Sequence, residues 1–201
     1  MNVTSIEELR ALYAAPKDRA IRKQLGRLDR HCRRFVSLSP FLVLASASGN
    51  GDMDASPRGG DPGFVKCPDE ATLLIADAPG NNRLDSLENI IATGRVGLLF
   101  MIPGVDETLR VNGAAVLSCA ETDIELCTNE RRRPKLVIRV AVREAYVHCA
   151  KALMRSRLWN PQSQIERSLL PTIGQMINDQ TGVEGPVETQ EEMRRRYAVD
   201  L

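Results

Sequence analysis

Two short stretches place an arginine beside small or turn-forming residues, each at the end of a predicted β-strand. The first is Asp54-Ala-Ser-Pro-Arg-Gly-Gly60, and the second is Pro79-Gly-Asn-Asn-Arg83. Small residues let a ligand approach the backbone closely. Arginine adds a permanent charge and a planar fork of donors that suits phosphate. The two corners together indicate a site for one phosphorylated ligand, and two exposed arginines at strand ends are the alternative.

The residue types around these arginines are those that a phosphate needs. A phosphate group carries about two negative charges, so its partial burial requires cationic or amide partners. Arg58 and Arg83 are the candidate cations, and Asn82 and Ser86 add neutral donors. Arg83 also opens a predicted helix, whose first amide groups favour an anion.

A second group of candidate ligand-binding residues follows the longest predicted strand. Lys151 and Arg155 are four residues apart and share one face of a predicted helix, and Trp159 lies one turn further on. Two cations and an indole suit a flat, partly anionic ring. In the alternative interpretation, Leu153 and Trp159 belong to the core and the charges are solvated.

A third group lies at period two on one predicted strand. Thr108, Arg110 and Asn112 alternate with apolar residues and therefore point to one face of the sheet. The sequence leaves open whether that face meets solvent or a ligand.

Several common catalytic signatures are absent from the sequence. It contains no Gly-x-Ser-x-Gly elbow and no glycine-rich loop of the dinucleotide or nucleoside-triphosphate type. His148 and Cys149 are explained by a local hydrogen bond and a structural thiol. No catalytic residue is therefore assigned, and no metal site is expected.

Composition narrows the class of protein. The 201 residues carry a formal net charge of +1 and only 4% aromatic residues, which argues against nucleic-acid and membrane-surface binding. Five cysteines, an odd number without Cys-x-x-Cys spacing, indicate reduced thiols. The first seventeen residues do not resemble a signal peptide, and no apolar run approaches the length of a membrane span. We therefore expect a cytoplasmic protein.

Short strands joined by hairpins and Gly/Pro turns predict a mainly β fold with flanking helices. The six predicted strands are Phe41–Ser48, Met53–Ser56, Thr72–Asp77, Val96–Ile102, Thr108–Leu117 and Lys135–His148, with a bulge expected at Gly113. The predicted helices are Ser5–Tyr13, Lys17–Val36, Arg83–Ala92, Glu121–Thr128, Ala150–Trp159, Gln164–Asp179 and Glu188–Tyr197, with an interruption of the Gln164–Asp179 helix near Pro171. We expect a single domain over residues 1–201: a helical segment at 1–38, a β core at 39–149 and a helical extension at 150–201.

This order of elements resembles the pyridoxamine 5′-phosphate oxidase-like flavoproteins, which have the FMN-binding split-barrel fold. The resemblance extends from about Arg30 to Trp159 and rests on the Ser-Pro-Arg-Gly and Gly-Asn-Asn-Arg motifs and on the segment from Lys151 to Trp159. Within that family the chain is most similar to the bacterial FMN-dependent oxidoreductases without an assigned substrate. The implied fold is a six-stranded antiparallel split β-barrel with helical extensions at both ends.

The resemblance also implies a homodimer with FMN at the subunit interface. One subunit would supply Ser56, Pro57 and Arg58 to the flavin and phosphate, and Asn82, Arg83 and Ser86 to the phosphate pocket. The segment that contains Lys151, Arg155 and Trp159 would reach the flavin from the other subunit or cover the cleft. Thr108 and Arg110 occupy the place of a Gln-x-Arg pair near the ring. Threonine in place of that glutamine argues against vitamin B6 oxidation more than against FMN binding.

The implied function is FMN-dependent hydride transfer to or from a small molecule, with NADH or NADPH as the candidate partner. Two alternatives use the same barrel. One is a flavin- or haem-binding carrier or sensor without turnover, and the other is a deazaflavin-dependent reductase.

Overall fold

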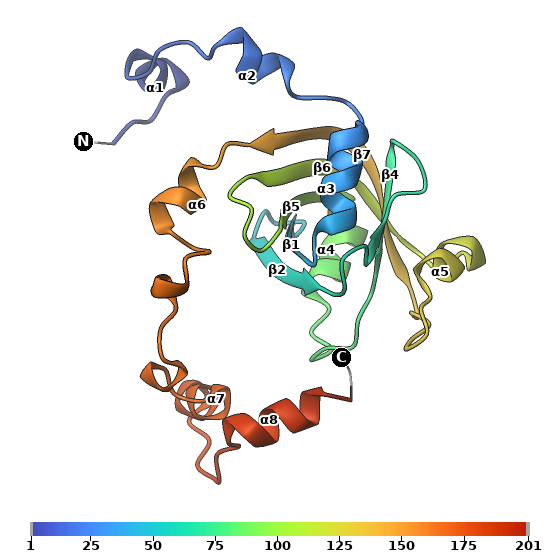
Figure 1. Ribbon diagram of the computed structural model, residues 1–201, viewed down its shortest axis with the longest axis vertical. Helices are drawn as coiled ribbons and strands as arrows, with labels where there is room; N and C mark the ends of the chain where they lie inside the picture. The colour runs from blue at the N-terminus through green and yellow to red at the C-terminus, as the bar shows by residue number, and fades with distance from the viewer. Residues whose placement is uncertain (1, 200–201) are drawn as a thin grey trace. The chain divides into compact units, whose positions relative to one another are not determined.

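Seven antiparallel strands form one curled sheet in the computed structural model, which describes residues 2–199 (Figure 1). The strands are β1 (Phe41–Ala47), β2 (Met53–Gly59), β3 (Val65–Lys66), β4 (Thr72–Ala76), β5 (Arg95–Met101), β6 (Thr108–Ser118) and β7 (Val137–His148). Their order across the sheet is β2-β1-β5-β6-β7-β4-β3. The predicted mainly β, split-barrel fold is confirmed, and the additional strand is the two-residue β3, too short for periodicity to reveal.

Alternation along the strands decides which face of the sheet is buried. In β1, Leu42 and Leu44 are fully buried, while Phe41 and Val43, which alternate with them, are half-buried. The buried residues of the other central strands lie on the same face, including Phe100 of β5 and Leu109 of β6. We call this the core face, and the opposite one the outer face.

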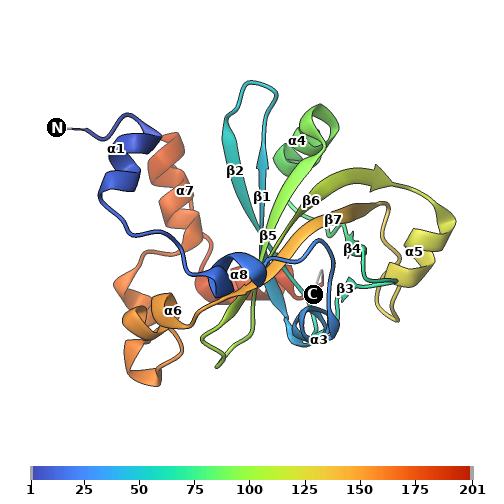
Figure 2. The same ribbon diagram turned by 90° about the horizontal axis from the view of Figure 1, so that it is seen from above.

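Two helices pack against the core face. Helix α3 (Arg30–Leu38) buries Cys32 and Val36 there, and α4 (Asp85–Thr93) buries Leu87 and Ile90. Helix α4 ends at a left-handed glycine, as the sequence predicts. Figure 2 shows both helices beside the curled sheet.

The register between β6 and β7 shifts at Asn112/Gly113, which confirms the predicted bulge. Only glycine fits there, because an added Cβ would lie 2.4 Å from the Ala141 carbonyl oxygen and 2.8 Å from a Val140 methyl. The shift leaves Arg143 of β7 without a partner in the register, and before it Thr108, Arg110 and Asn112 lie on the outer face opposite His148, Tyr146 and Glu144.

The prediction of one long helix from Lys17 to Val36 is wrong. Helix α1 (Ile6–Ala11) is followed by α2 (Asp18–Arg22), and the chain then runs extended until α3 begins at Arg30. In this extended strap, residues 23–28, Leu25 exchanges backbone hydrogen bonds with Ala145 of β7. Pairing with the free end of a strand outweighs the helical periodicity, because β4 stops pairing with β7 at Ala141.

The remaining helices of the first part of the chain are short. Helix α5 (Glu121–Cys127) covers the outer face near β4 through Ile124 and Cys127. Helix α6 (Lys151–Ser156) buries none of its residues. It ends earlier than predicted, because Arg157 adopts a left-handed conformation with φ 53°.

Contacts group the chain into two units, Met1–Ser156 and Arg157–Leu201. The second unit consists of two short 3₁₀ helices, Pro161–Ser163 and Arg167–Leu169, followed by α7 (Ile173–Thr181) and α8 (Gln190–Tyr197). The predicted interruption near Pro171 is confirmed, because the second 3₁₀ helix ends at Leu169 and α7 begins at Ile173. The single-domain organisation stays a prediction. Within residues 2–199, no helix has both the length and the apolar character needed to cross a membrane.

Candidate functional site

The loop between β4 and α4 is tied to strand β2 at both of its ends. At one end, the Arg58 guanidinium lies 3.5 Å from the Asp77 carboxylate. At the other, the Ser86 hydroxyl donates to Asp54 Oδ2 at 2.6 Å. Ser56 lies between these ties on β2, so the loop that carries the second arginine motif is fastened at both ends to the edge strand that carries the first. We call this region the β2–α4 corner.

The backbone of this loop leaves the start of α4 open. Asn82 and Leu84 both have left-handed conformations, with φ 58° and 60°. Asparagine tolerates that conformation well, whereas leucine does not. Leu84 is also the residue before the helix, and it provides no side-chain cap. No side chain therefore caps the first turn of α4, in which the Leu87 amide donates to the Leu84 carbonyl at 2.8 Å, and an uncapped helix start favours an anion.

Aspartates neutralise both arginines of the corner. Arg83 is exposed and pairs with Asp85 at 2.8 Å, and the hydrogen bond and charge of Asp85, with a smaller effect of Asp54, raise the pKa of Arg83. Arg58 is mostly covered, and its Nε is buried without a hydrogen-bond partner. A phosphate entering the corner would compete with Asp77 and Asp85 for the guanidinium groups.

The predicted residues of β2 do not share one face. Arg58 lies opposite Leu42 and Ser56 opposite Leu44, so both point to the core face at the sheet edge. Pro57 lies opposite Val43 and points to the outer face. Ser86 is 4% exposed, and its hydroxyl is already engaged by Asp54. The corner thus offers Arg58, Arg83, Asn82 and amides to a ligand more directly than it offers Ser86 or Pro57.

A second polar cluster lies on the outer face around Arg110. The Arg110 guanidinium stacks 4.9 Å from the Tyr146 ring centre, donates to the Tyr146 hydroxyl through Nη2, and has a buried Nε without a partner. The His148 ring centre lies 4.9 Å from that of Tyr146. Thr108 lies opposite His148 in the register, and Asn112 donates to Glu144. The predicted shared face of Thr108, Arg110 and Asn112 is confirmed.

The strap brings a further cation to this cluster. Lys23 Nζ donates to the Val147 carbonyl at 2.8 Å and lies 5.3 Å from the centre of the Tyr146 ring. Burial, then the charges of Arg110 and Lys23, lowers the pKa of His148. The cluster therefore favours neutral His148 and has an excess of positive charge suited to an anionic or electron-rich group.

The two cations of the second predicted group, Lys151 and Arg155, do not join either cluster within one chain. Lys151 and Arg155 are exposed on α6, where Arg155 Nε donates to the Lys151 carbonyl at 3.1 Å. Trp159 is half-buried and lies beyond the end of α6, in the second unit. The expected single helix through Trp159 is thus wrong, while a role for these residues at a cofactor stays a prediction.

Three residues of these regions were not singled out from the sequence, and they are Tyr146, Asp77 and Lys23. Tyr146 and His148 alternate along β7 and could have been paired with Arg110 and Thr108, had the register been known. Asp77 is the last residue of a predicted strand, and it directly follows the observed β4, like many site residues. Lys23 carries no such signal, because its position depends on the break between α2 and α3. No three His, Cys, Asp or Glu side chains within residues 2–199 are grouped to hold a metal ion.

Residues 28–149 match the family model described as pyridoxamine 5′-phosphate oxidase. That range includes every strand of the sheet, both arginine motifs and the Arg110 cluster. The chain belongs to the pyridoxamine 5′-phosphate oxidase family. No curated protein matches the sequence.

Solved structures have the same fold at low sequence identity. HupZ from Group A Streptococcus is 14% identical, with a TM-score of 0.50 over 60% of this chain and 99% of that one. A candidate pyridoxamine 5′-phosphate oxidase from Lactobacillus delbrueckii is 18% identical, with a TM-score of 0.47 over 62% and 98%. An FMN-binding protein from Syntrophomonas wolfei is 10% identical, with a TM-score of 0.44 over 58% and 83%.

The donors of the β2–α4 corner fit the phosphate of a flavin mononucleotide. Arg58 Nε is a buried donor without a partner, Arg83 is an exposed cation, and the first amides of α4 are uncapped. Each of these groups binds an oxyanion in proteins. Asp77 and Asp85 pair with the two arginines, so a phosphate would have to compete with these carboxylates.

Proposed function

We propose that the protein is an FMN-dependent oxidoreductase that transfers hydride to or from a small molecule. The observation that carries this proposal is the β2–α4 corner, where Arg58 of the edge strand pairs with Asp77 at one end of the loop before α4, and Arg83 pairs with Asp85 at the uncapped start of α4. Membership of a family named for a flavin enzyme supports the choice of FMN over other phosphorylated ligands. When bound, FMN supplies the hydride chemistry, and the protein supplies the phosphate grip, orientation and exclusion of water.

The Arg110 cluster is the proposed environment of the flavin ring. Arg110 lies three strands from Pro57 on the same outer face, a span of about 14 Å at the usual strand spacing. Strands β1 and β5 therefore lie between a phosphate bound at the β2 edge and a flavin ring bound beside Arg110. The positive charge of Arg110 would stabilise negative charge that develops on a reduced ring.

A second copy of the chain is the proposed cover of this outer face. Half-buried apolar residues line it next to Arg110, and they are Phe41, Val43, Leu99 and Met101. Lys151 and Arg155, which join neither cluster in one chain, would contact the flavin across such an interface, together with Trp159. The complete site would then require the homodimer.

Titration of the purified protein with FMN, followed by flavin fluorescence and absorbance, tests the proposal. We expect Arg83→Ala to weaken FMN binding about tenfold or more, because it removes one charge-assisted contact. Arg131→Ala is the matched control, since Arg131 is exposed and lies in the distant loop before β7. Equal affinity of wild type and Arg83→Ala would refute the phosphate assignment, and absence of FMN binding would refute the proposal.

Turnover separates an enzyme from a binding module. We expect NADH or NADPH to reduce the bound FMN and the reduced protein to pass the electrons to an acceptor in repeated cycles. Binding without reduction by either donor would favour the carrier or sensor alternative. Competition of FMN against a deazaflavin and against haem identifies the preferred cofactor.

A further inference from the structure

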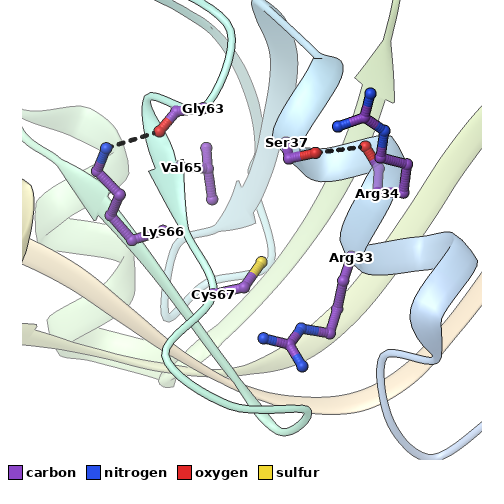
Figure 3. Close-up of a pocket in the computed structure, with 7 residues that line it drawn as sticks. All are labelled: Arg33, Arg34, Ser37, Gly63, Val65, Lys66 and Cys67. Carbon is purple, nitrogen blue, oxygen red and sulfur yellow. Dashed lines mark hydrogen bonds between the residues drawn. The ribbon is translucent and has the colours of Figure 1, made fainter.

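A cavity of about 460 Å³ lies between helix α3 and the segment that contains β3 (Figure 3). Its size is in the range of small-molecule pockets. The lining residues are Arg33, Arg34, Ser37, Gly63, Val65, Lys66 and Cys67. None of them belongs to the β2–α4 corner or to the Arg110 cluster, so this cavity is a separate candidate site.

The lining contains three cations and no carboxylate. In the part of the chain that the structure describes, Arg33 and Arg34 form no ion pair, whereas the nearby Arg27 pairs with Glu70 at 3.1 Å. Asp69, two residues after the lining residue Cys67, accepts a hydrogen bond from the Ala71 amide at 2.7 Å. The positive charge of the lining is therefore left for a ligand to neutralise.

The two sides of the cavity are held by the core. Val36 of α3 is fully buried, and Val65 of β3 is 3% exposed. The core therefore fixes the backbone of both elements close to the charged residues that line the cavity. Figure 3 shows Arg33 extending from α3 toward Cys67, and the charge of Arg33 acts on that thiol. Lys66 lies across the strand, with its ammonium group 2.9 Å from the Gly63 carbonyl. The two backbone walls of the cavity are thus fixed by the core, and the Arg33 and Arg34 side chains that they carry are exposed.

The chemistry of the lining selects one class of ligand. Guanidinium groups recognise phosphate oxygens better than they recognise single negative charges. Val65 and the Cys67 side chain add an apolar surface that inorganic ions do not need. We propose that this cavity binds a phosphorylated small molecule with two or more negative charges, independently of the FMN site.

Calorimetric titration with pyrophosphate and with ribose 5-phosphate, in buffer of physiological ionic strength, tests this inference. We expect both probes to bind, and Arg33→Ala to weaken binding about tenfold or more through loss of one charge-assisted contact. Arg33→Lys should restore part of the affinity. Arg30→Ala is the control, because Arg30 lies on the same helix but outside the cavity. Arg83→Ala should leave binding of both probes unchanged, just as Arg33→Ala should leave FMN binding unchanged.

The thiol of Cys67 provides a second readout at the cavity itself. In a variant with Cys119→Ser and Cys149→Ser, which removes the two exposed thiols, alkylation of Cys67 should slow several-fold when pyrophosphate is present. Arg33→Ala should abolish this protection. Equal affinity of wild type and Arg33→Ala, or alkylation of Cys67 unaffected by saturating pyrophosphate, would overturn the proposal. Equal loss of affinity in Arg30→Ala and Arg33→Ala would also overturn it, because it would indicate diffuse attraction to the helix.

Discussion

Replacing Asp77 by asparagine should tighten the binding of FMN. Asp77 holds Arg58 at 3.5 Å, and both side chains are mostly covered, with 23% and 18% exposure. At that distance Coulomb attraction amounts to about 1 kcal/mol in water and about 5 kcal/mol at an effective dielectric constant of about 20. Because a bound phosphate must displace this attraction, a net gain of about 1–2 kcal/mol is expected. That gain corresponds to roughly five- to thirtyfold tighter binding.

The same substitution should destabilise the protein without ligand. Arg58 would lose its carboxylate and remain partly buried with an unpartnered Nε, which costs free energy. We therefore expect the midpoint of thermal unfolding to fall for apo Asp77→Asn and to recover at saturating FMN. A lower unfolding midpoint of the apo protein together with a higher affinity for FMN would indicate competition between Asp77 and phosphate for Arg58. General damage to the fold would lower both the midpoint and the affinity.

Fluorescence titration of FMN and thermal unfolding with and without FMN provide both measurements. Asp61→Asn is the matched control, since Asp61 is an exposed aspartate in the loop after β2. An unchanged or weakened affinity in Asp77→Asn, with Asp61→Asn equal to wild type, would show that Arg58 does not exchange Asp77 for phosphate.

Three further predictions concern the bulge, the Arg110 cluster and the cysteines. Gly113→Ala should destabilise the protein by about 1–3 kcal/mol in chemical denaturation, because its Cβ would overlap the Ala141 carbonyl, whereas Gly49→Ala, in open space, should be neutral. NMR titration of His148 should give a pKa below 6.5, the ordinary value for histidine. Its contribution to stability is therefore fully present above pH 6.5 and is lost as the pH falls through the lowered pKa. Lys23→Gln should raise the pKa of His148, and an unchanged pKa would contradict the assigned effect of the Lys23 charge. Thiol titration of the folded protein near pH 8 should detect two cysteines that react fast, and a third fast-reacting thiol would contradict this prediction. The fast pair is Cys119 and Cys149, because burial raises the pKa of Cys32 to about 12 and that of Cys67 and Cys127 to about 11.

The curl of the sheet explains why two separate polar regions are available for one elongated ligand. Arg58 lies on the edge strand and turns to the core face, while Arg110 lies on a central strand and turns to the outer face. A ligand that uses both must pass around the edge of β2. Pro57, which lies on the outer face of β2, has no backbone N–H group, so this strand has one hydrogen-bond donor fewer.

Sequence alone determined the strands and several turns of this protein. The alternation of apolar and polar residues, together with the Gly/Pro turns, places six strands within a few residues of their observed bounds. The reason is that side chains of a half-buried strand point alternately to its buried and exposed faces. Gly94 and Gly113 were read correctly for a related reason, since a left-handed helix end and a crowded bulge both exclude a Cβ. Arg58 and Arg83 were identified from local composition, which marks the ends of strands.

Tertiary structure decided which of these residues meet. Arg58 pairs with Asp77, and Lys23 reaches Tyr146, through contacts between segments that are distant in the chain. Period and propensity do not encode such pairings, because they depend on strand order, register and the face toward which each side chain turns. The strap at residues 23–28 is the clearest case: its sequence has helical spacing, yet the unpaired end of β7 offers backbone hydrogen bonds that only the folded sheet can supply.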